Sequence, residues 1–185
     1  MGADLSVPSG IVCAMAELVE RVDEEDHVLA VVERSEAIRR RWLHRVATTV
    51  CRDPEGRFLV HRRPDDDSRF PGRYNWLLGG AANVGETYEA AAARELAEEI
   101  GVRASPRFVF KYLCRGVISP YWLGVHEATV TQLITPDASE VAWHTWLTEA
   151  ELRDAIRSPN FVPDAREAFT RYHALTDPPE RPRVE

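Results

Sequence analysis

The stretch from Thr87 to Gly101 constrains the fold most, because it is the one strongly helical stretch in the sequence. It is rich in alanine, glutamate and leucine, with Thr87 at the position of an N-cap and Gly101 where a left-handed residue commonly ends a helix. One side carries an apolar stripe of Ala92, Ala93, Leu96 and Ile100. Because such a stripe packs against another element, the sequence predicts a helix docked on a sheet.

Three carboxylates, Glu95, Glu98 and Glu99, share the neighbouring side of this helix. Their spacing of three and four residues places them within a sector of about 100°. Like charges in one sector repel each other, and a hard divalent cation with oxygen ligands would offset that repulsion. The carboxylates alone leave open a second interpretation, an acidic face in contact with solvent.

Short alternating segments on both sides of the helix predict β-strands. The expected strands are residues 17–22, 27–32, 44–52, 57–62, 76–80, 107–114, 121–131 and 141–147. Turn sequences predict that the first four form two hairpins. A short helix capped by Ser35 and two amphipathic helices at 149–157 and 163–175 complete the set. The expected fold class is α+β, with a mixed β-sheet in an α/β/α sandwich.

The length of 185 residues suits a single domain. We expect this domain to cover residues 15–175, after a disordered lead over 1–14 and before a disordered, proline-rich tail over 176–185. Patterned sequence begins just after Met15, which leaves Met1 and Met15 as alternative starts of translation.

Composition excludes several classes of function. A net charge of −7 argues against binding to nucleic-acid polymers or to anionic membranes. No apolar run approaches the roughly 18 residues needed to span a bilayer, and the apolar stretch 11–16 lacks the basic region of a signal peptide. The three cysteines, Cys13, Cys51 and Cys114, are widely spaced, which predicts neither a disulfide framework nor a zinc site. The cytoplasm is the expected location.

The string GAANVGETYEAAAARELAEEIGV, residues 80–102, gives the carboxylates a chemical context. It matches the pattern G-x5-E-x7-R-E-U-x-E-E-x-G-U, with U aliphatic, at Gly80, Glu86, Arg94, Glu95, Leu96, Glu98, Glu99, Gly101 and Val102. A chance match at one start position is on the order of one in ten million, so the pattern is specific. It is the Nudix box, and the chain resembles the Nudix hydrolase family in element order from about residue 17 to 175. The resemblance implies a Nudix fold over 15–175, with an N-terminal extension at 17–43.

The resemblance also implies a role for each polar residue of the box. The metal ligands, for Mg²⁺ or Mn²⁺, would be Gly80, Glu95, Glu98 and Glu99. Glu86 would support the loop or the metal shell, and Arg94 would orient the glutamates by ion pairing. Glu95, Glu98 and Arg94 are the expected catalytic residues. The implied reaction is attack of a metal-oriented water on phosphorus in a nucleoside diphosphate linked to another moiety.

The general base stays open between a box glutamate, which we favour, and Glu140, which precedes the last expected strand. Arg62 and Arg63 end a strand and could bind phosphate, although such a pair is often only exposed. Trp76 could stack on a base, although burial in the core is the commoner explanation for such an aromatic residue. The expected ligand is a small diphosphate, and the sequence leaves open whether the chain forms a homodimer.

The segments LVERVDEEDHVLAVVERSEAIRRRWLHRVATT and FLVHRRPDDDSRFPGRYNW resemble the opening of isopentenyl-diphosphate isomerase, a Nudix-fold enzyme with an N-terminal extension. That enzyme has a cysteine and a histidine just after the matching tryptophan, whereas WLLGGAAN contains neither. No carboxylate occurs between Gly101 and Glu127, and only His44 matches its N-terminal metal histidines. We therefore expect a hydrolase. An isomerase-like enzyme and a non-catalytic ligand-binding module are the alternatives.

Overall fold

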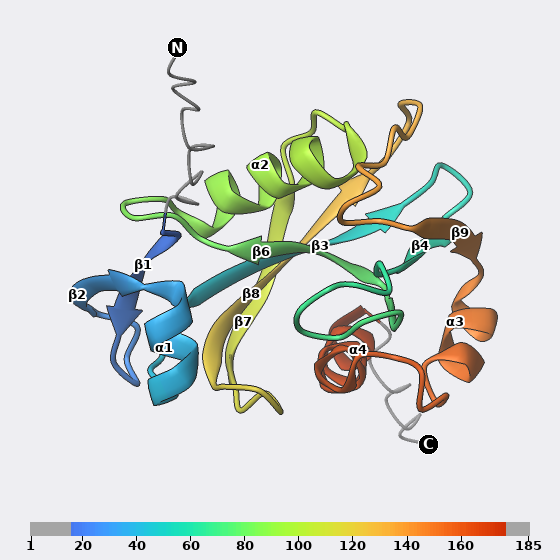
Figure 1. The fold of residues 1–185 in the computed structure, drawn as a ribbon. Coiled ribbons are helices and arrows are strands. Elements are labelled where there is room, and N and C mark those ends of the chain that lie inside the picture. Colours follow the sequence, from blue (N-terminus) through green and yellow to red (C-terminus); the bar gives the residue numbers. More distant parts are fainter. Residues whose placement is uncertain (1–15, 177–185) are drawn as a thin grey trace, which may run out of the picture.

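The computed structural model describes residues 16–176 and shows a mixed sheet between helices (Figure 1). The expected lead over 1–14 lies outside the described residues, as does the expected tail except for Thr176, which ends the last helix. The elements are β1 (Leu18–Val22), β2 (Val28–Glu33), α1 (Arg34–Arg40), β3 (Arg45–Arg52), β4 (Phe58–Arg62), β5 (Tyr74–Asn75), β6 (Leu77–Ala81), α2 (Tyr88–Ile100), β7 (Arg107–Cys114), β8 (Tyr121–Thr129), β9 (Trp143–Leu147), α3 (Glu149–Ala155) and α4 (Pro163–Thr176).

The main sheet has seven strands, with β5-β4-β3-β8-β7 as its path, β6 paired to β3, and β9 paired to β4. Only the β3–β8 ladder is parallel, so the sheet is mixed and the expected α+β class is confirmed. The predicted hairpin of β3 and β4 is wrong except at its turn, where Arg52 pairs with Phe58. Beyond that pair the strands diverge, because β3 continues along β6 and β8 while β4 continues along β5 and β9.

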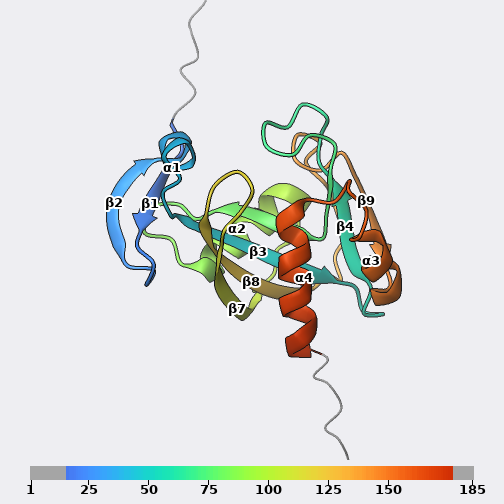
Figure 2. The same cartoon turned by 90° about the horizontal axis from the view of Figure 1, so that it is seen from below.

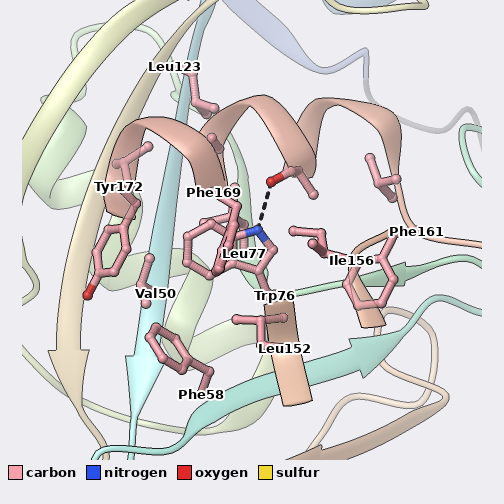
Figure 3. Packing of buried hydrophobic residues seen from close by; sticks show 14 of the residues in the cluster. Val50, Phe58, Trp76, Leu77, Leu123, Leu152, Ile156, Phe161, Phe169 and Tyr172 are labelled. Atoms are coloured by element: carbon pink, nitrogen blue, oxygen red, sulfur yellow. Dashed lines mark hydrogen bonds between the residues drawn. The ribbon is translucent and has the colours of Figure 1, made fainter. Parts of the chain in front are cut away.

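Helices cover both faces of the sheet, with α2 on one side and α4 on the other (Figures 1 and 2). Beneath α4 the core is built around Trp76, which is 1% exposed and whose indole N–H donates to the Ala165 carbonyl at 2.9 Å (Figure 3). Phe58, Phe169 and Tyr172 meet its ring edge to face. A second cluster, which includes Leu59, Leu78, Leu96 and Ile100, lies under α2.

The N-terminal extension forms a separate two-stranded sheet, β1–β2, followed by α1 (Figure 1). The predicted N-cap Ser35 is wrong, because the helix begins at Arg34 with Glu33 as its cap. The Arg41 guanidinium, just after this helix, donates to the Ile118 carbonyl at 2.9 Å and so ties the extension to the loop between β7 and β8. No helix among residues 16–176 is long and apolar enough to cross a membrane.

Two buried histidines predict a pH dependence of stability. Burial lowers the pKa of His61 to about 3 and that of His44 to about 4. Their unfolded pKa is about 6.5, so below that pH the unfolded chain takes up protons that the folded chain does not, and stability falls. Between pH 7 and pH 5, we expect the free energy of unfolding to fall by about 2 kcal/mol more in wild type than in His61→Leu. Urea unfolding at both pH values measures this difference, and equal losses in the two proteins would contradict it.

Candidate active site

Local sequence fixes both ends of α2, which carries the carboxylates. The Thr87 hydroxyl accepts the Ala90 N–H at 3.2 Å, and Gly101 ends the helix with φ 70°. A Cβ on Gly101 would lie 2.0 Å from the Thr135 hydroxyl, so a side chain there would force Thr135 to move, and the left-handed backbone favours glycine. The predicted apolar stripe is confirmed with one change: Ala91, rather than Ala93, is fully buried.

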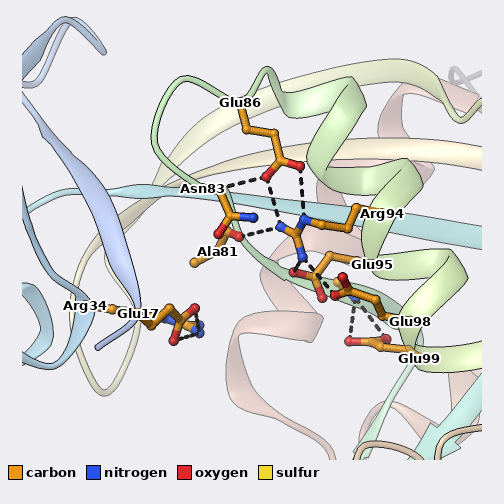
Figure 4. Close-up of polar contacts among 10 residues, drawn as sticks. Glu17, Arg34, Ala81, Asn83, Glu86, Arg94, Glu95, Glu98 and Glu99 are labelled. Carbon is orange, nitrogen blue, oxygen red and sulfur yellow. Dashed lines mark hydrogen bonds and ion pairs between the residues drawn. The ribbon is translucent and has the colours of Figure 1, made fainter. Parts of the chain in front are cut away.

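Arg94 organises the carboxylates of this helix (Figure 4). Its guanidinium forms a two-pronged contact with Glu86, at 3.0 and 2.9 Å, and donates to the Ala81 carbonyl at 3.0 Å. The remaining nitrogen donates to Glu95 at 2.8 Å and to Glu98 at 3.0 Å. The hydrogen bonds with Glu86 are the main cause of the raised pKa of Arg94. The guanidinium therefore stays positively charged between the glutamates that it contacts.

The loop before α2 is held from both sides. On the inner side Glu86 accepts the Asn83 N–H at 2.8 Å, in addition to the contacts from Arg94. On the outer side the Gly85 N–H donates to Glu20 of β1 at 3.0 Å, and Arg45 holds the other oxygen of Glu20 at 2.8 Å. The N-terminal extension therefore fixes the loop that the box sequence forms.

Glu99 is a buried carboxylate, 6% exposed, at the edge of β6. Both of its oxygens lie 3.2 Å from the Gly79 N–H. Burial, followed by the charge of Glu95, raises the pKa of Glu99 to about 8. Burial also raises the pKa of Glu95, against the effect of Arg94. Two carboxylates held in a site that disfavours their negative charge fit a cation, which would stabilise the ionised form of both.

Gly80 allows β6 to pass directly beneath Glu95. A Cβ at Gly80 would lie 2.7 Å from a Glu95 oxygen, so a larger residue would displace the carboxylate. Glu98 lies at the rim, where its side chain is 59% exposed and turned toward Arg94. Among residues 16–176, no three carboxylate, histidine or cysteine side chains already converge as a cation site. Binding through all three glutamates would therefore require Glu98 to leave Arg94.

A cavity of ≈ 850 Å³, measured with its open mouth, begins at Gly79 and Gly80 on the opposite side of β6 from α2. Its walls come from α1, the loop between β4 and β5, the loop between β7 and β8, and the first turn of α4, which Figure 2 shows around one region of the sheet. Apolar residues, including Val46, Leu77 and Leu123, form part of the lining. Three arginines also line it: Arg34, Arg63 and Arg69.

Two of the three cavity arginines form ion pairs at its wall. Arg34 pairs with Glu17 at 2.7 Å and Arg63 pairs with Asp67, yet the Nε atom of each arginine is buried without a partner. Burial, followed by repulsion from Arg34 and Arg63, lowers the pKa of Arg69. Guanidinium groups in this arrangement are suited to phosphate oxygens.

The two arginines that the sequence singled out lie in different places. Arg63 lines the cavity, whereas Arg62 does not and instead pairs with Asp65 on the surface. Arg34 and Arg69 were missed, because neither belongs to a motif and they lie far apart along the chain. The two arginines can be recognised as candidate phosphate-binding residues only from the fold, which brings α1 next to the loop between β4 and β5.

The other two predicted residues lie in different settings. Trp76 is enclosed in the core, so its predicted contact with substrate is wrong. Glu140 lies in the loop before β9, where its charge contributes to the raised pKa of Glu99. That loop is anchored to α2, because the Asp137 N–H donates to the Glu99 carbonyl at 2.9 Å.

The chain is similar to several known proteins. A family model described as the NUDIX domain matches residues 42–172. An uncharacterized Nudix hydrolase of Streptomyces coelicolor is 39% identical over 89% of this chain and 93% of its own length. A prenyl-diphosphate phosphatase of Methanosarcina mazei is 30% identical over 82% and 92%, respectively.

Two further relatives extend the comparison. An isopentenyl-diphosphate Delta-isomerase of Nocardia farcinica is 35% identical over 73% of this chain and 81% of its own. The crystal structure of DR0079 from Deinococcus radiodurans superposes with a TM-score of 0.73 at 27% identity, covering 84% of this chain and 98% of that one.

Proposed function

The chain belongs to the Nudix hydrolase family, and from this premise we propose that it hydrolyses a diphosphate linkage with the help of Mg²⁺ or Mn²⁺. The substrate class that we propose is a nucleoside diphosphate linked to another moiety. We propose that residues 15–175 act as one domain and that the reaction takes place in the cytoplasm, where the buried, unpaired thiols of Cys51 and Cys114 would stay reduced.

The observation that carries the proposal is the position of the glutamates and the arginines on opposite sides of Gly79 and Gly80. Bound between them, a divalent cation would neutralise phosphate charge and lower the pKa of a bound water. The residues that would hold it are the Gly80 carbonyl, Glu95, Glu98 and Glu99. Arg34, Arg63 and Arg69 would bind phosphate oxygens, and Arg94 would keep Glu86 and Glu95 in place.

The general base is proposed to be Glu95, with Glu140 as the alternative. Burial raises the pKa of Glu95, which makes its carboxylate a better proton acceptor. We expect Glu140→Gln to keep kcat within about tenfold of wild type, whereas Glu95→Gln loses roughly 10²- to 10⁴-fold. A pH-rate profile separates the cases, because loss of the base removes the acidic limb. If Glu140→Gln lost that limb while Glu95→Gln kept it, the base would lie on the loop before β9.

A prenyl diphosphate is a second candidate substrate, because a relative that is 30% identical carries the name of a prenyl-diphosphate phosphatase and the cavity is partly apolar. Isomerase activity is less well supported despite the Nocardia farcinica relative. No cysteine is among the described residues that line the cavity, and Cys51 and Cys114 are each 1% exposed elsewhere. A purely ligand-binding role is less well supported as well, because all three box glutamates, Glu95, Glu98 and Glu99, are present.

A panel of diphosphates tests the proposal. Nucleoside diphosphates and triphosphates, nucleotide sugars, dinucleotides and prenyl diphosphates would each be incubated with the protein and Mg²⁺ or Mn²⁺. We expect release of phosphate or of a nucleoside monophosphate from at least one compound. Tight binding without turnover of any compound would favour the ligand-binding module.

A further inference from the structure

The cavity also contains hydrogen-bond acceptors, which lie toward β8, across the sheet from Gly79 and Gly80. β3 lies between β6, which carries the two glycines, and β8, which begins at Tyr121. Neighbouring strands are about 4.8 Å apart, so two strand spacings place β8 about 10 Å from the glycine edge. Gly124 is the β8 residue level with Gly80, and Tyr121 lies three residues further along the strand, which brings its separation from Gly80 to roughly 14 Å. The apolar residues Val46 and Leu123 line the cavity on β3 and β8.

Hydrogen-bond acceptors gather on that side of the cavity. Asp164, in the first turn of α4, accepts the Tyr121 hydroxyl at 2.8 Å and the Val117 N–H at 3.4 Å. A carboxylate has about four lone-pair sites, so two protein donors, one of them distant, leave acceptor capacity open to the cavity that Asp164 lines. Tyr121 cannot donate to a ligand at the same time, because its single proton is used by Asp164.

His44 adds a second acceptor. The residue is 2% exposed, and its Nδ1 lies 3.4 Å from the Trp42 carbonyl, which assigns the proton to Nδ1 and leaves a lone pair on Nε2. Burial lowers the pKa of His44 to about 4, so the ring is neutral at pH 7. Its ring lies 6.2 Å from that of Tyr121, on the same side of the cavity as Asp164.

From this geometry we propose that the cavity selects diphosphates whose organic group carries a hydroxyl or amino donor at the end remote from the diphosphate, bound by Asp164 and His44. The inference rests on the proposed function for the position of the diphosphate. A purely hydrocarbon group would displace water from the Asp164 carboxylate without offering it a hydrogen bond, and this loss of hydration disfavours binding. A nucleoside, with its amino and hydroxyl groups, satisfies the acceptors, whereas an unmodified prenyl chain does not.

Two matched pairs of ligands test this selectivity. Geranyl diphosphate is compared with its terminally hydroxylated derivative, and purine riboside diphosphate, which lacks the amino group, is compared with ADP. Binding is measured by calorimetry in EDTA, and turnover is measured in Mg²⁺. In at least one pair, we expect the member with the extra donor to bind at least about tenfold more tightly to wild type.

Variants locate the selectivity. Asp164→Ala should bring the ratio within the selective pair close to one, and Asp164→Asn serves if the alanine variant does not fold. Glu167→Ala removes an exposed carboxylate from the same helix and should leave the ratio unchanged. Equal binding within both pairs, or a ratio that Asp164→Ala and Asp164→Asn do not alter, would overturn the inference. Selective binding without turnover would instead retain the inference and reject hydrolysis.

Discussion

Replacing Glu99 with glutamine is expected to lower kcat by roughly two to four orders of magnitude at saturating Mg²⁺, because the buried carboxylate would lose its charge as a metal ligand. The fold should remain intact. Glutamine keeps the shape of the side chain, and burial already favours a neutral group at this position, since it raises the pKa of Glu99 to about 8. Steady-state kinetics and thermal unfolding of the metal-free protein measure the two effects separately.

Glu98→Gln should lower kcat by a similar factor, although the Glu98 side chain is exposed. Glu98 would act as a metal ligand only after its carboxylate leaves Arg94. Glu89→Gln is the matched control. It removes a carboxylate from an exposed position of the same helix, outside the sector shared by Glu95, Glu98 and Glu99. If Glu98→Gln and Glu99→Gln both behaved like this control, the assignment of the metal site would be wrong.

Arg94→Met is expected to affect both stability and activity. The substitution would leave Glu86 and Glu95, whose side chains are 15% and 14% exposed, without their cation. We expect the free energy of unfolding to fall by about 2–3 kcal/mol, because partly buried carboxylates would remain uncompensated. We also expect kcat to fall by roughly two to three orders of magnitude, since Glu95 and the loop before α2 would lose their orientation.

Arg94→Lys distinguishes charge from geometry. A lysine ammonium restores a positive charge but cannot form the two-pronged contact with Glu86 while also reaching Ala81 and Glu95. Urea unfolding should therefore recover part of the stability, whereas kcat should stay low. Full recovery of kcat by lysine would show that only the charge of Arg94 matters.

The box helix could be predicted from sequence because its interactions are local. Thr87, Gly101 and the spacing of Glu95, Glu98 and Glu99 act within a few turns of one helix, and the structure contains them as expected. The direction in which each carboxylate points was not predictable. That direction depends on β6, where Gly79 donates to Glu99 and Gly80 lies beneath Glu95.

The cavity was not predictable, because its walls come from segments that are distant in sequence. Arg34 and Arg69 meet only through tertiary packing, and Trp76 is drawn into the core by Phe58, Phe169 and Tyr172 rather than toward a ligand. The pairing of β4 with β9 and the early start of α1 have the same origin, since tertiary contacts override local turn and cap signals.

Hydrolysis in water enriched in the heavy oxygen isotope tests metal-dependent water attack on a diphosphate most directly. The most active compound of the panel, and isopentenyl diphosphate, would be incubated with the protein and Mg²⁺ in the labelled water. We expect one heavy oxygen in a phosphate product of the active compound, no dimethylallyl diphosphate, and loss of turnover in excess EDTA. Turnover that continues in EDTA, or isomerised product without label in phosphate, would contradict hydrolysis by this site.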